Sequence, residues 1–185
     1  MCSASGRWPS GFETSRASLQ RLLEAFQETS TRIFCDVNLR QHYYDRETLE
    51  HSLRVSHILK LNAEEVATVS RMFLTQPTGS LRDICHGLAH RFDLSIVLVT
   101  LGAEGAGVYH EEDYGVVPGH RVQVVDTIGA GDAFSAAFLT DYLRHDDPVA
   151  AVKVANRIGA YVASKAGALP AYEGTLSELL QRKRS

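Results

Sequence analysis

The residues best suited to chemistry lie in one short stretch, where two glycines precede an aspartate at the start of a predicted helix. Gly129, Ala130 and Gly131 are followed by Asp132, and apolar residues then recur at helical spacing over 133–143. Glycines let the backbone come close to a ligand, and the first N–H groups of a helix have no partner within it. Such a helix end binds anions, phosphates above all.

Asp132 places a carboxylate at this anion-binding helix end. The helix dipole tolerates a negative charge there, and the carboxylate can take a proton from a group held beside a phosphate. An alcohol between Asp132 and the γ-phosphate of a nucleotide would be deprotonated as it attacks. The stretch therefore predicts phosphoryl transfer to a hydroxyl, although an aspartate that only caps an ordinary helix explains the same local pattern.

A strand and a turn must position this helix start. A β-branched run over 122–125 predicts a strand that ends at Asp126 and leads into the glycine turn. The dinucleotide-binding fingerprint G-x-G-x-x-G/A also follows a strand, but Phe134 stands here where that fingerprint needs a third small residue. A Rossmann dinucleotide site is therefore disfavoured.

The seven residues 126–132 read D-T-I-G-A-G-D and resemble the D-T-x-G-A-G-D signature of the ribokinase/PfkB family of carbohydrate kinases. The resemblance implies that Asp132 is the catalytic base and that the amides of 129–131 form an anion hole for the transferring phosphate. It also implies ATP with Mg²⁺ and a sugar as the molecules bound. In many members a loop matching 165–170 surrounds a monovalent cation with residues matching Asp126 and Ile128, which makes K⁺ a further expectation.

Polar residues alternate at the carboxyl end of a buried strand predicted over 32–37, in the order Asp36, Asn38, Arg40. Ligands bind at the carboxyl ends of strands in open α/β sheets, and Arg40 can clamp a phosphate or a sugar acid with two hydrogen bonds. The D-x-N-x-R pattern is similar to that of fructokinase-like and ketodeoxygluconate-kinase-like members, which implies that these residues bind a fructose-like ketose or a keto-sugar acid. A salt bridge between Asp36 and Arg40 that fixes a loop explains the spacing equally well.

Asn62 and Glu65 follow a strand predicted over 57–61 and stand three apart at a helix start. They match the N-x-x-E motif of the family, which implies that Glu65 holds Mg²⁺ through water. A capping box between the two residues is the structural alternative.

The most hydrophobic run, 94–100, predicts a central strand buried on both faces. The residues after it resemble the T-x-G-x-x-G segment of the family, which implies that Thr100, Gly102 and Gly105 lie against the nucleotide. A hairpin with an ordinary turn is predicted beyond them, over 107–118. Asn156, on a predicted helix, matches the place where family members contact adenine.

Composition limits the class of protein. The 185 residues are 44% hydrophobic and carry a formal net charge of −3, which gives no general attraction to nucleic acid or to a membrane. No apolar run is long enough to span a bilayer, and three scattered cysteines suit a reducing cytoplasm. His86 and His90 share a helix face, but without a third ligand nearby we expect surface or packing residues and no zinc.

Strands and helices alternate, which predicts one open parallel α/β layer. Helices are predicted over 14–29, 46–55, 65–73, 81–92, 133–144, 148–164 and 175–182. The family resemblance implies a three-layer α/β/α fold with a mostly parallel, Rossmann-like sheet, truncated at the N-terminus.

The resemblance covers nearly the whole chain but only the later part of a family member. We therefore expect 1–185 to be a single PfkB-type domain that lacks the lid and most of the sugar site. The alternative is a non-catalytic nucleotide-binding or interaction remnant of a sugar kinase. An exposed sheet edge would also favour a homodimer.

Overall fold

The computed structural model describes residues 2–3, 18, 21–23, 25–26, 29, 31–39, 44–76 and 78–172. The chain divides into two compact units, Met1–Val97 and Leu98–Ser185. The division into compact units does not test the prediction of a single domain over 1–185, which stays a prediction.

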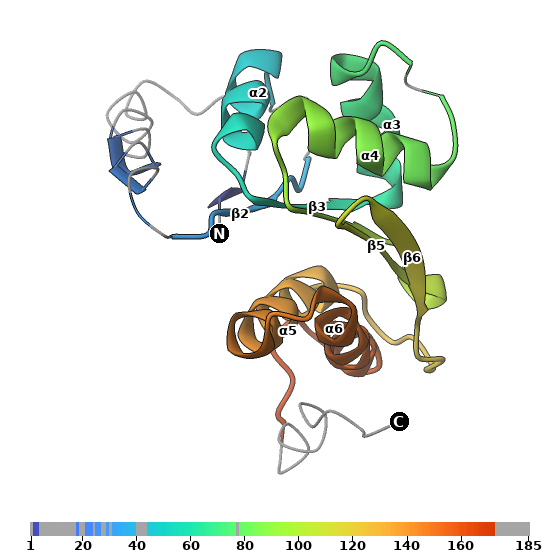
Figure 1. Cartoon of the computed structure of the whole chain (residues 1–185). Coiled ribbons are helices and arrows are strands. Elements are labelled where there is room, and N and C mark those ends of the chain that lie inside the picture. The colour runs from blue at the N-terminus through green and yellow to red at the C-terminus, as the bar shows by residue number, and fades with distance from the viewer. Residues whose placement is uncertain are drawn as a thin grey trace. The chain divides into compact units, whose positions relative to one another are not determined.

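The first unit contains parallel strands and, after residue 44, three helices that the structure describes from end to end. The strands, hydrogen-bonded in this order, are β1 (Cys2–Ser3), β2 (Phe34–Asp36) and β3 (Ile58–Asn62). The helices are α2 (Arg46–Arg54), α3 (Ala63–Phe73) and α4 (Leu81–Phe92). All three helices lie on one face of β2 and β3 (Figure 1). Apolar residues on both strands are buried, as parallel strands covered by helices require.

Side-chain caps fix where these three helices begin. Asp45 accepts a hydrogen bond from the backbone of Thr48 at the start of α2, and Asn62 and Ser80 each form a capping box at the starts of α3 and α4. Each cap satisfies an N–H group that has no partner within the helix. β4 (Ile96–Thr100) begins in the first unit, where the N–H of Ile96 donates to the carbonyl of His57, and ends in the second.

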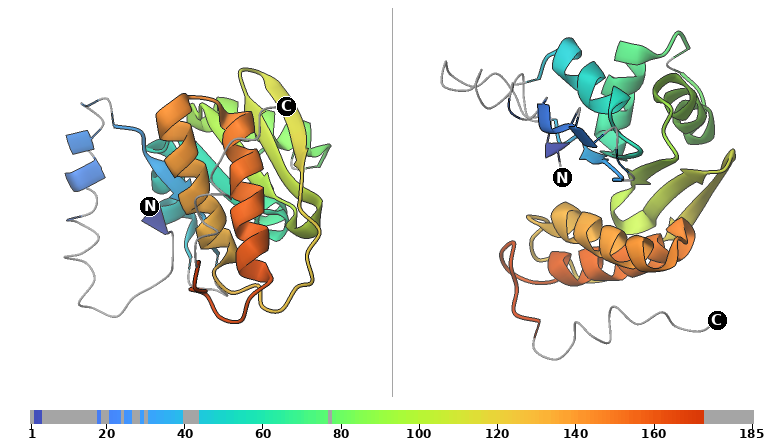
Figure 2. Two further views of the ribbon diagram at one scale, coloured as in Figure 1. Left: turned by 90° about the horizontal axis from the view of Figure 1, so that it is seen from below. Right: turned by 60° about the vertical axis from the view of Figure 1, so that its left-hand side comes forward.

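The second unit contains a hairpin and two long helices. Its elements after β4 are the 3₁₀-helix η1 (Gly102–Glu104), β5 (Gly105–His110), β6 (Asp113–Pro118), α5 (Ala130–His145) and α6 (Pro148–Ala163). β5 and β6 are antiparallel, which confirms the predicted hairpin. α5 and α6 lie side by side (Figure 2). They approach closely where Gly159 meets the first turn of α5, since a Cβ there would lie 3.3 Å from the Ala130 carbonyl oxygen.

Most predicted elements are present with bounds shifted by a few residues, but the strand predicted over 122–125 is wrong. The structure has no strand there, and the side chains of Val124 and Val125 are 57% and 59% exposed. β-branched residues favour a strand only where a neighbouring strand completes the ladder. Here the N–H groups of Val125 and Asp126 instead donate to the carbonyl of Ala163 at the end of α6.

Two predicted helices lie wholly or partly outside the described residues. Residues 18, 21–23 and 25–26 of the helix predicted over 14–29 are helical, whereas 175–182 is not described. Among the described helices, none is both long and apolar enough to cross a membrane.

Candidate functional site

The start of α5 differs from the starts of the other long helices that the structure describes. The first turns of α2, α3, α4 and α6 are each capped by a side chain, from Asp45, Asn62, Ser80 and Asp147. At α5 the N-cap residue is Gly129, in the left-handed conformation with φ 78°, and it forms no side-chain cap. The N–H groups of Gly131 and Asp132, in the first turn of the helix, therefore have no side-chain acceptor. An anion site at a helix start requires such unoccupied donors.

Asp126 holds the turn before α5 against the loop after α6. Its carboxylate accepts hydrogen bonds from the N–H of Ile128 at 2.9 Å and from the N–H of Gly167 at 3.2 Å. A Cβ at Gly129 would lie 2.7 Å from the carbonyl oxygen of Ala168, so only glycine allows the two loops to approach this closely. The position of the α5 start is therefore fixed by contacts within the second unit.

Asp132 lies in the first turn of α5 and is exposed. Within the described part of the chain its carboxylate has no hydrogen-bond or ion-pair partner. Phe134 and Ser135, which follow it, are buried and anchor the helix from the other side. The carboxylate is thus available to an external group beside the open helix end.

In the first unit, two charged side chains meet between β2 and β3. The ammonium group of Lys60 donates to Oδ2 of Asp36 at 2.8 Å, and the two side chains are only 8% and 7% exposed. The strand register places Asp36 directly opposite Lys60. Arg40, the partner considered for Asp36 from the sequence, lies outside the described residues.

Sequence reasoning missed Lys60, although a signal was present. It stands between Leu59 and Leu61 in an apolar strand buried on both faces, where a lysine needs a partner of opposite charge. The partner is found only once the register with β2 is known.

Glu65 is held by the backbone on both sides of its carboxylate. Oε1 accepts from the N–H of Leu39 and Oε2 from the N–H of Asn62, both at 2.8 Å, while Oδ1 of Asn62 accepts from the N–H of Glu65. The capping box considered from the sequence is therefore present. Leu39 also ties the loop after β2 to this site, at a point where Asn38 takes the left-handed conformation with φ 44°.

The surroundings of Glu65 perturb its titration. Burial raises the pKa of its carboxyl group above the ordinary value, and the charge of Asp36 adds to this, while the two backbone N–H groups and Lys60 act in the opposite direction. Each carboxylate oxygen retains an acceptor site beyond the backbone hydrogen bond it already has. This donor set fits a metal ion held through a bound water.

Two glycines after β4 are required for different reasons. At Gly105, with φ 105°, a Cβ would overlap the carbonyl oxygen of Val117, so the close approach of β6 explains this glycine. At Gly102, with φ 60°, a Cβ would meet nothing within 4 Å. The space beside Gly102 is open to a ligand, and Thr100, two positions earlier at the end of β4, is half-buried.

Asn156 is buried in α6 and is bonded to the hairpin. Its side-chain amide donates to the carbonyl oxygens of Val117 and Pro118, at 3.0 and 3.2 Å. These hydrogen bonds give the side chain a structural role in joining α6 to β6. The side-chain oxygen Oδ1 of Asn156 takes no part in these two hydrogen bonds, so it is the atom that a nucleobase could contact.

Each unit thus brings together part of the predicted site. The first unit gathers Asp36, Asn62 and Glu65 around the ends of β2 and β3. The second unit joins Asp126 to the turn that precedes Asp132. Ile128, expected at a cation site, projects an exposed side chain from this turn.

These features define an α/β protein with an uncapped, glycine-rich helix start of the kind that binds phosphate groups. Comparison with known proteins specifies the family. Residues 10–173 match the pfkB family carbohydrate kinases, and the chain belongs to this family.

Curated relatives of the chain include fructokinases. The chain is 32% identical to fructokinase-1 of Zea mays over 178 residues, which cover 91% of this chain and 54% of the relative. It is 33% identical to a fructokinase of Escherichia coli over 133 residues, covering 69% of this chain and 41% of the relative. The chain therefore spans about half the length of these relatives.

Solved structures show a ribokinase-like fold. Fructokinase from Vibrio cholerae O395, in its fructose, ADP and calcium ion bound form, superposes with a TM-score of 0.76 at 27% identity, covering 90% of this chain and 56% of that one. A putative ribokinase II from E. coli in complex with ATP and Mg²⁺ gives a TM-score of 0.74 at 25% identity, covering 88% and 51%. The predicted α/β, ribokinase-like class is confirmed.

Proposed function

We propose that this chain carries the nucleotide and catalytic part of an ATP-dependent sugar kinase, with Asp132 as the general base. The observation that carries the proposal is the combination of an uncapped helix start with an exposed carboxylate in its first turn. Membership of the pfkB family supports the reaction class.

The amides of residues 129–131 form the proposed anion hole. The open first turn of α5 offers N–H groups to the three equatorial oxygens of the transferring phosphoryl group, where negative charge is spread in the transition state. Asp132 accepts the proton of the sugar hydroxyl as that oxygen attacks the γ-phosphorus. The bond to the leaving ADP oxygen breaks as the new bond forms.

Mg²⁺ would be held through water by Glu65 and would neutralise charge on the nucleotide phosphates. Asn62 positions Glu65 by accepting its N–H. Thr100, Gly102 and Gly105 are assigned to the phosphates and ribose, of which Gly102 has the open side. Asn156 is assigned to adenine through its side-chain oxygen.

A K⁺ ion is proposed near Asp126 and Ile128, where a carboxylate and a backbone carbonyl supply oxygen ligands. Asp36, Asn38 and Arg40 are assigned to the sugar, with a fructose-like ketose or a keto-sugar acid as the substrate class. Relatives named as fructokinases favour the ketose. A cytoplasmic location and a homodimer also belong to the proposal, to be examined by cell fractionation and by size-exclusion chromatography.

The test is calorimetric titration of MgATP into the chain and into the variant Asp132→Asn, followed by an ADP-release assay on both with a panel of sugars. Asn is close in shape to Asp but cannot accept the proton. We expect unchanged nucleotide binding and a loss of turnover of about 10²–10⁴-fold, the usual contribution of a general base.

The variant Asp146→Asn is a matched control, because it makes the same change at the other end of α5 in a left-handed position that asparagine also adopts. It should leave binding and turnover unchanged. Nucleotide binding without turnover in the unmodified chain would contradict catalysis by this chain and favour the non-catalytic alternative. No nucleotide binding at all would refute the site itself.

A further inference from the structure

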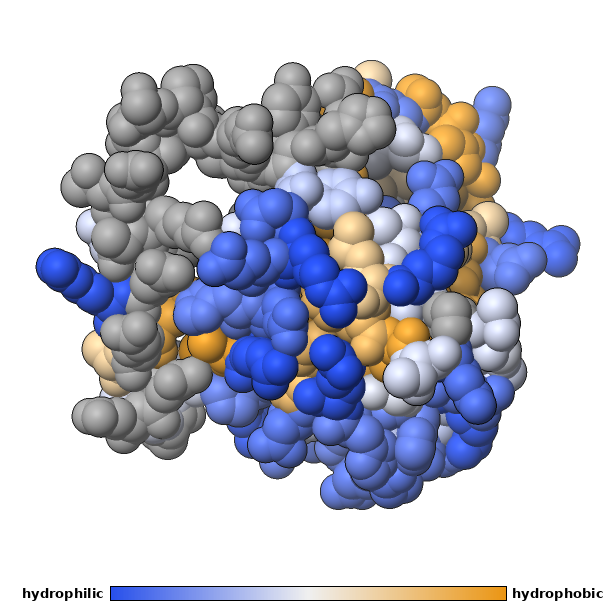
Figure 3. All heavy atoms as spheres, turned by 90° about the horizontal axis from the view of Figure 1, so that it is seen from above, coloured by the Kyte–Doolittle hydropathy of each residue, from blue (hydrophilic) through white to orange (hydrophobic). Residues whose placement is uncertain are grey.

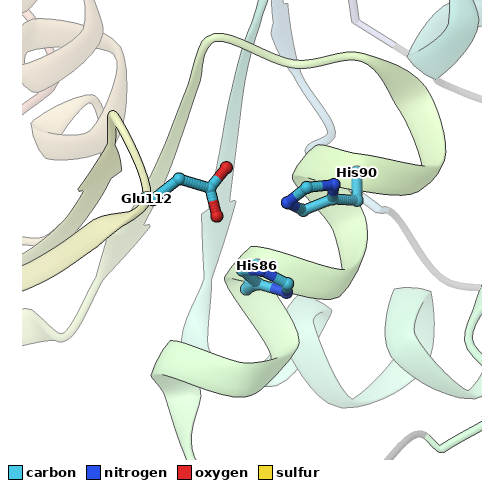
Figure 4. A group of neighbouring side chains, drawn as sticks. All are labelled: His86, His90 and Glu112. Atoms are coloured by element: carbon cyan, nitrogen blue, oxygen red, sulfur yellow. The ribbon is translucent and has the colours of Figure 1, made fainter.

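α4 carries two histidines on its outer face that the proposed kinase site does not use. His86 and His90 are exposed and stand one turn apart. Their ring centroids are 4.2 Å apart, with the ring planes tilted by 40° (Figure 4). Glu112, also drawn there, belongs to the turn between β5 and β6 of the second unit. The two imidazoles therefore already lie together on one helix face.

The helix beneath the two histidines is firmly held. A capping box formed by Ser80 and Asp83 starts it, and Asp93, in the left-handed conformation, ends it by donating its N–H to Ala89. The inner face of α4 is buried through Ile84, Cys85, Leu88, Ala89 and Phe92. A Cβ at Gly87 would lie 3.2 Å from Leu74, so this glycine lets the helix pack closely there. A rigid helix keeps the imidazole spacing set before any ligand arrives.

The charges around the pair do not exclude a cation. Hydrophilic and hydrophobic side chains both reach the surface in the view of Figure 3. Asp83 lies one turn before His86, and its hydrogen bonds from Ser80, followed by the charge of Arg82, lower the pKa of its carboxyl group. The negative charge of Asp83 thus stands next to the positive charge of Arg82 on this helix. The guanidinium group of Arg91 is directed to Glu50, at 3.8 Å, and lies over the ring of Phe92.

We propose that His86 and His90 form a chelating pair for a divalent transition-metal ion of the Zn²⁺ class. A ring nitrogen of one lies within 4.8 Å of a ring nitrogen of the other. Two nitrogens bound to one tetrahedral Zn²⁺ at about 2.0–2.1 Å lie about 3.3–3.4 Å apart, so the two nitrogens need to approach by at most about 1.5 Å. Imidazole nitrogen is a preferred ligand of Zn²⁺, Cu²⁺ and Ni²⁺, and histidines at i and i+4 share one helix face.

The expectation of no zinc from the sequence rested on the lack of a third ligand nearby. Two imidazoles occupy two of the four tetrahedral positions of Zn²⁺, which leaves the other two to water. The closeness of the two rings is what the sequence alone does not provide. The site is independent of the proposed kinase function.

The test is calorimetric titration of ZnCl₂ into the full chain in a buffer with excess Mg²⁺, which occupies oxygen-rich sites while leaving imidazoles to zinc. The variant His90→Ala removes one ligand. The double variant Arg82→His/His86→Ala keeps the number of histidines but places the two remaining ones two turns apart. Alanine is the best helix former, and circular dichroism verifies that both variants are folded.

We expect one zinc ion to bind per chain. Both variants should bind zinc at least about 10-fold more weakly, because the loss of a hydrogen-bond partner of a metal ligand already costs about 10–100-fold in metal affinity. Zinc should also raise the thermal unfolding midpoint of the unmodified chain more than that of either folded variant. Equal zinc affinity in the unmodified chain and in the double variant would overturn the proposal. Absence of zinc binding to the unmodified chain would overturn it as well.

Discussion

Replacing Lys60 by methionine should destabilise the protein strongly, because it leaves a buried charge without its partner. Methionine keeps most of the length of the lysine stem and removes only the ammonium group. Asp36, whose side chain is 7% exposed, would then lose the group that donates to it at 2.8 Å. Breaking a buried ion pair from one side costs about 3–5 kcal/mol, a large part of the roughly 5–15 kcal/mol that stabilises an ordinary domain.

The double variant Asp36→Leu/Lys60→Met should be far less damaging than Lys60→Met. Replacing both members of a buried ion pair by apolar residues is often neutral or stabilising by about 1–4 kcal/mol. The assay is urea unfolding followed by far-ultraviolet circular dichroism, with all variants compared at equal dependence on denaturant. The two single variants, Asp36→Leu and Lys60→Met, and the double variant together give the coupling energy of the pair.

Arg54→Met provides the matched control. Arg54 donates to Glu50 at 2.7 Å, at a distance close to that of the buried pair, but its side chain is 58% exposed. Water screens such a pair, so we expect no measurable change in stability. If Lys60→Met were as mild as Arg54→Met, or if the changes at positions 36 and 60 were additive within about 0.5 kcal/mol, the reasoning on burial would be refuted.

Three further predictions follow from single residues. Gly105→Ala should destabilise the protein by at least about 1–3 kcal/mol, because the new Cβ overlaps the Val117 carbonyl. Gly102→Ala should cost only about 1–2 kcal/mol, the strain of a left-handed alanine, but it should weaken MgATP binding. Thermal melts give the two stabilities and titration calorimetry gives the affinity for MgATP. The pKa of Glu65 is raised in the folded protein, so the protonated carboxyl group contributes stability below its ordinary pKa near 4.5, and this contribution is lost as the pH rises through the raised pKa. Urea unfolding at several pH values should show this loss of stability in the unmodified chain and not in Glu65→Gln. Asn156→Ala should cost about 1–3 kcal/mol in urea unfolding, because it removes a buried hydrogen bond to the Val117 carbonyl and a partly buried one to the Pro118 carbonyl. Equal stability of the two proteins would contradict the structural role.

Local patterns were enough to predict the helices and their starts. Asn62 three residues before Glu65 is a signal that needs no distant partner, and the capping box weighed there as the structural alternative is present. The glycine turn before Asp132 is equally local. The resemblance of 126–132 to a family signature then led to the correct family and fold class.

Features that depend on partners far along the chain were not predictable. The pairing of Asp36 with Lys60 requires the register of two parallel strands, 24 positions apart in sequence. The amide of Asn156 reaches carbonyls 39 and 38 positions away. The strand expected over 122–125 failed for the same reason, since β-branched residues show a preference for strands but do not show whether a neighbouring strand exists.

The glycine at the start of α5 has a consequence for anyone who would engineer this protein for heat resistance. Installing a serine or aspartate cap at a bare helix start is among the usual stabilising substitutions. At Gly129 it would fail, because any side chain meets the Ala168 backbone, and because the left-handed φ strains most residues that carry a Cβ. A library of variants selected only for thermal tolerance should therefore gain substitutions elsewhere and keep glycine at position 129. Retention of this glycine would then be explained by backbone geometry, without any selection for activity.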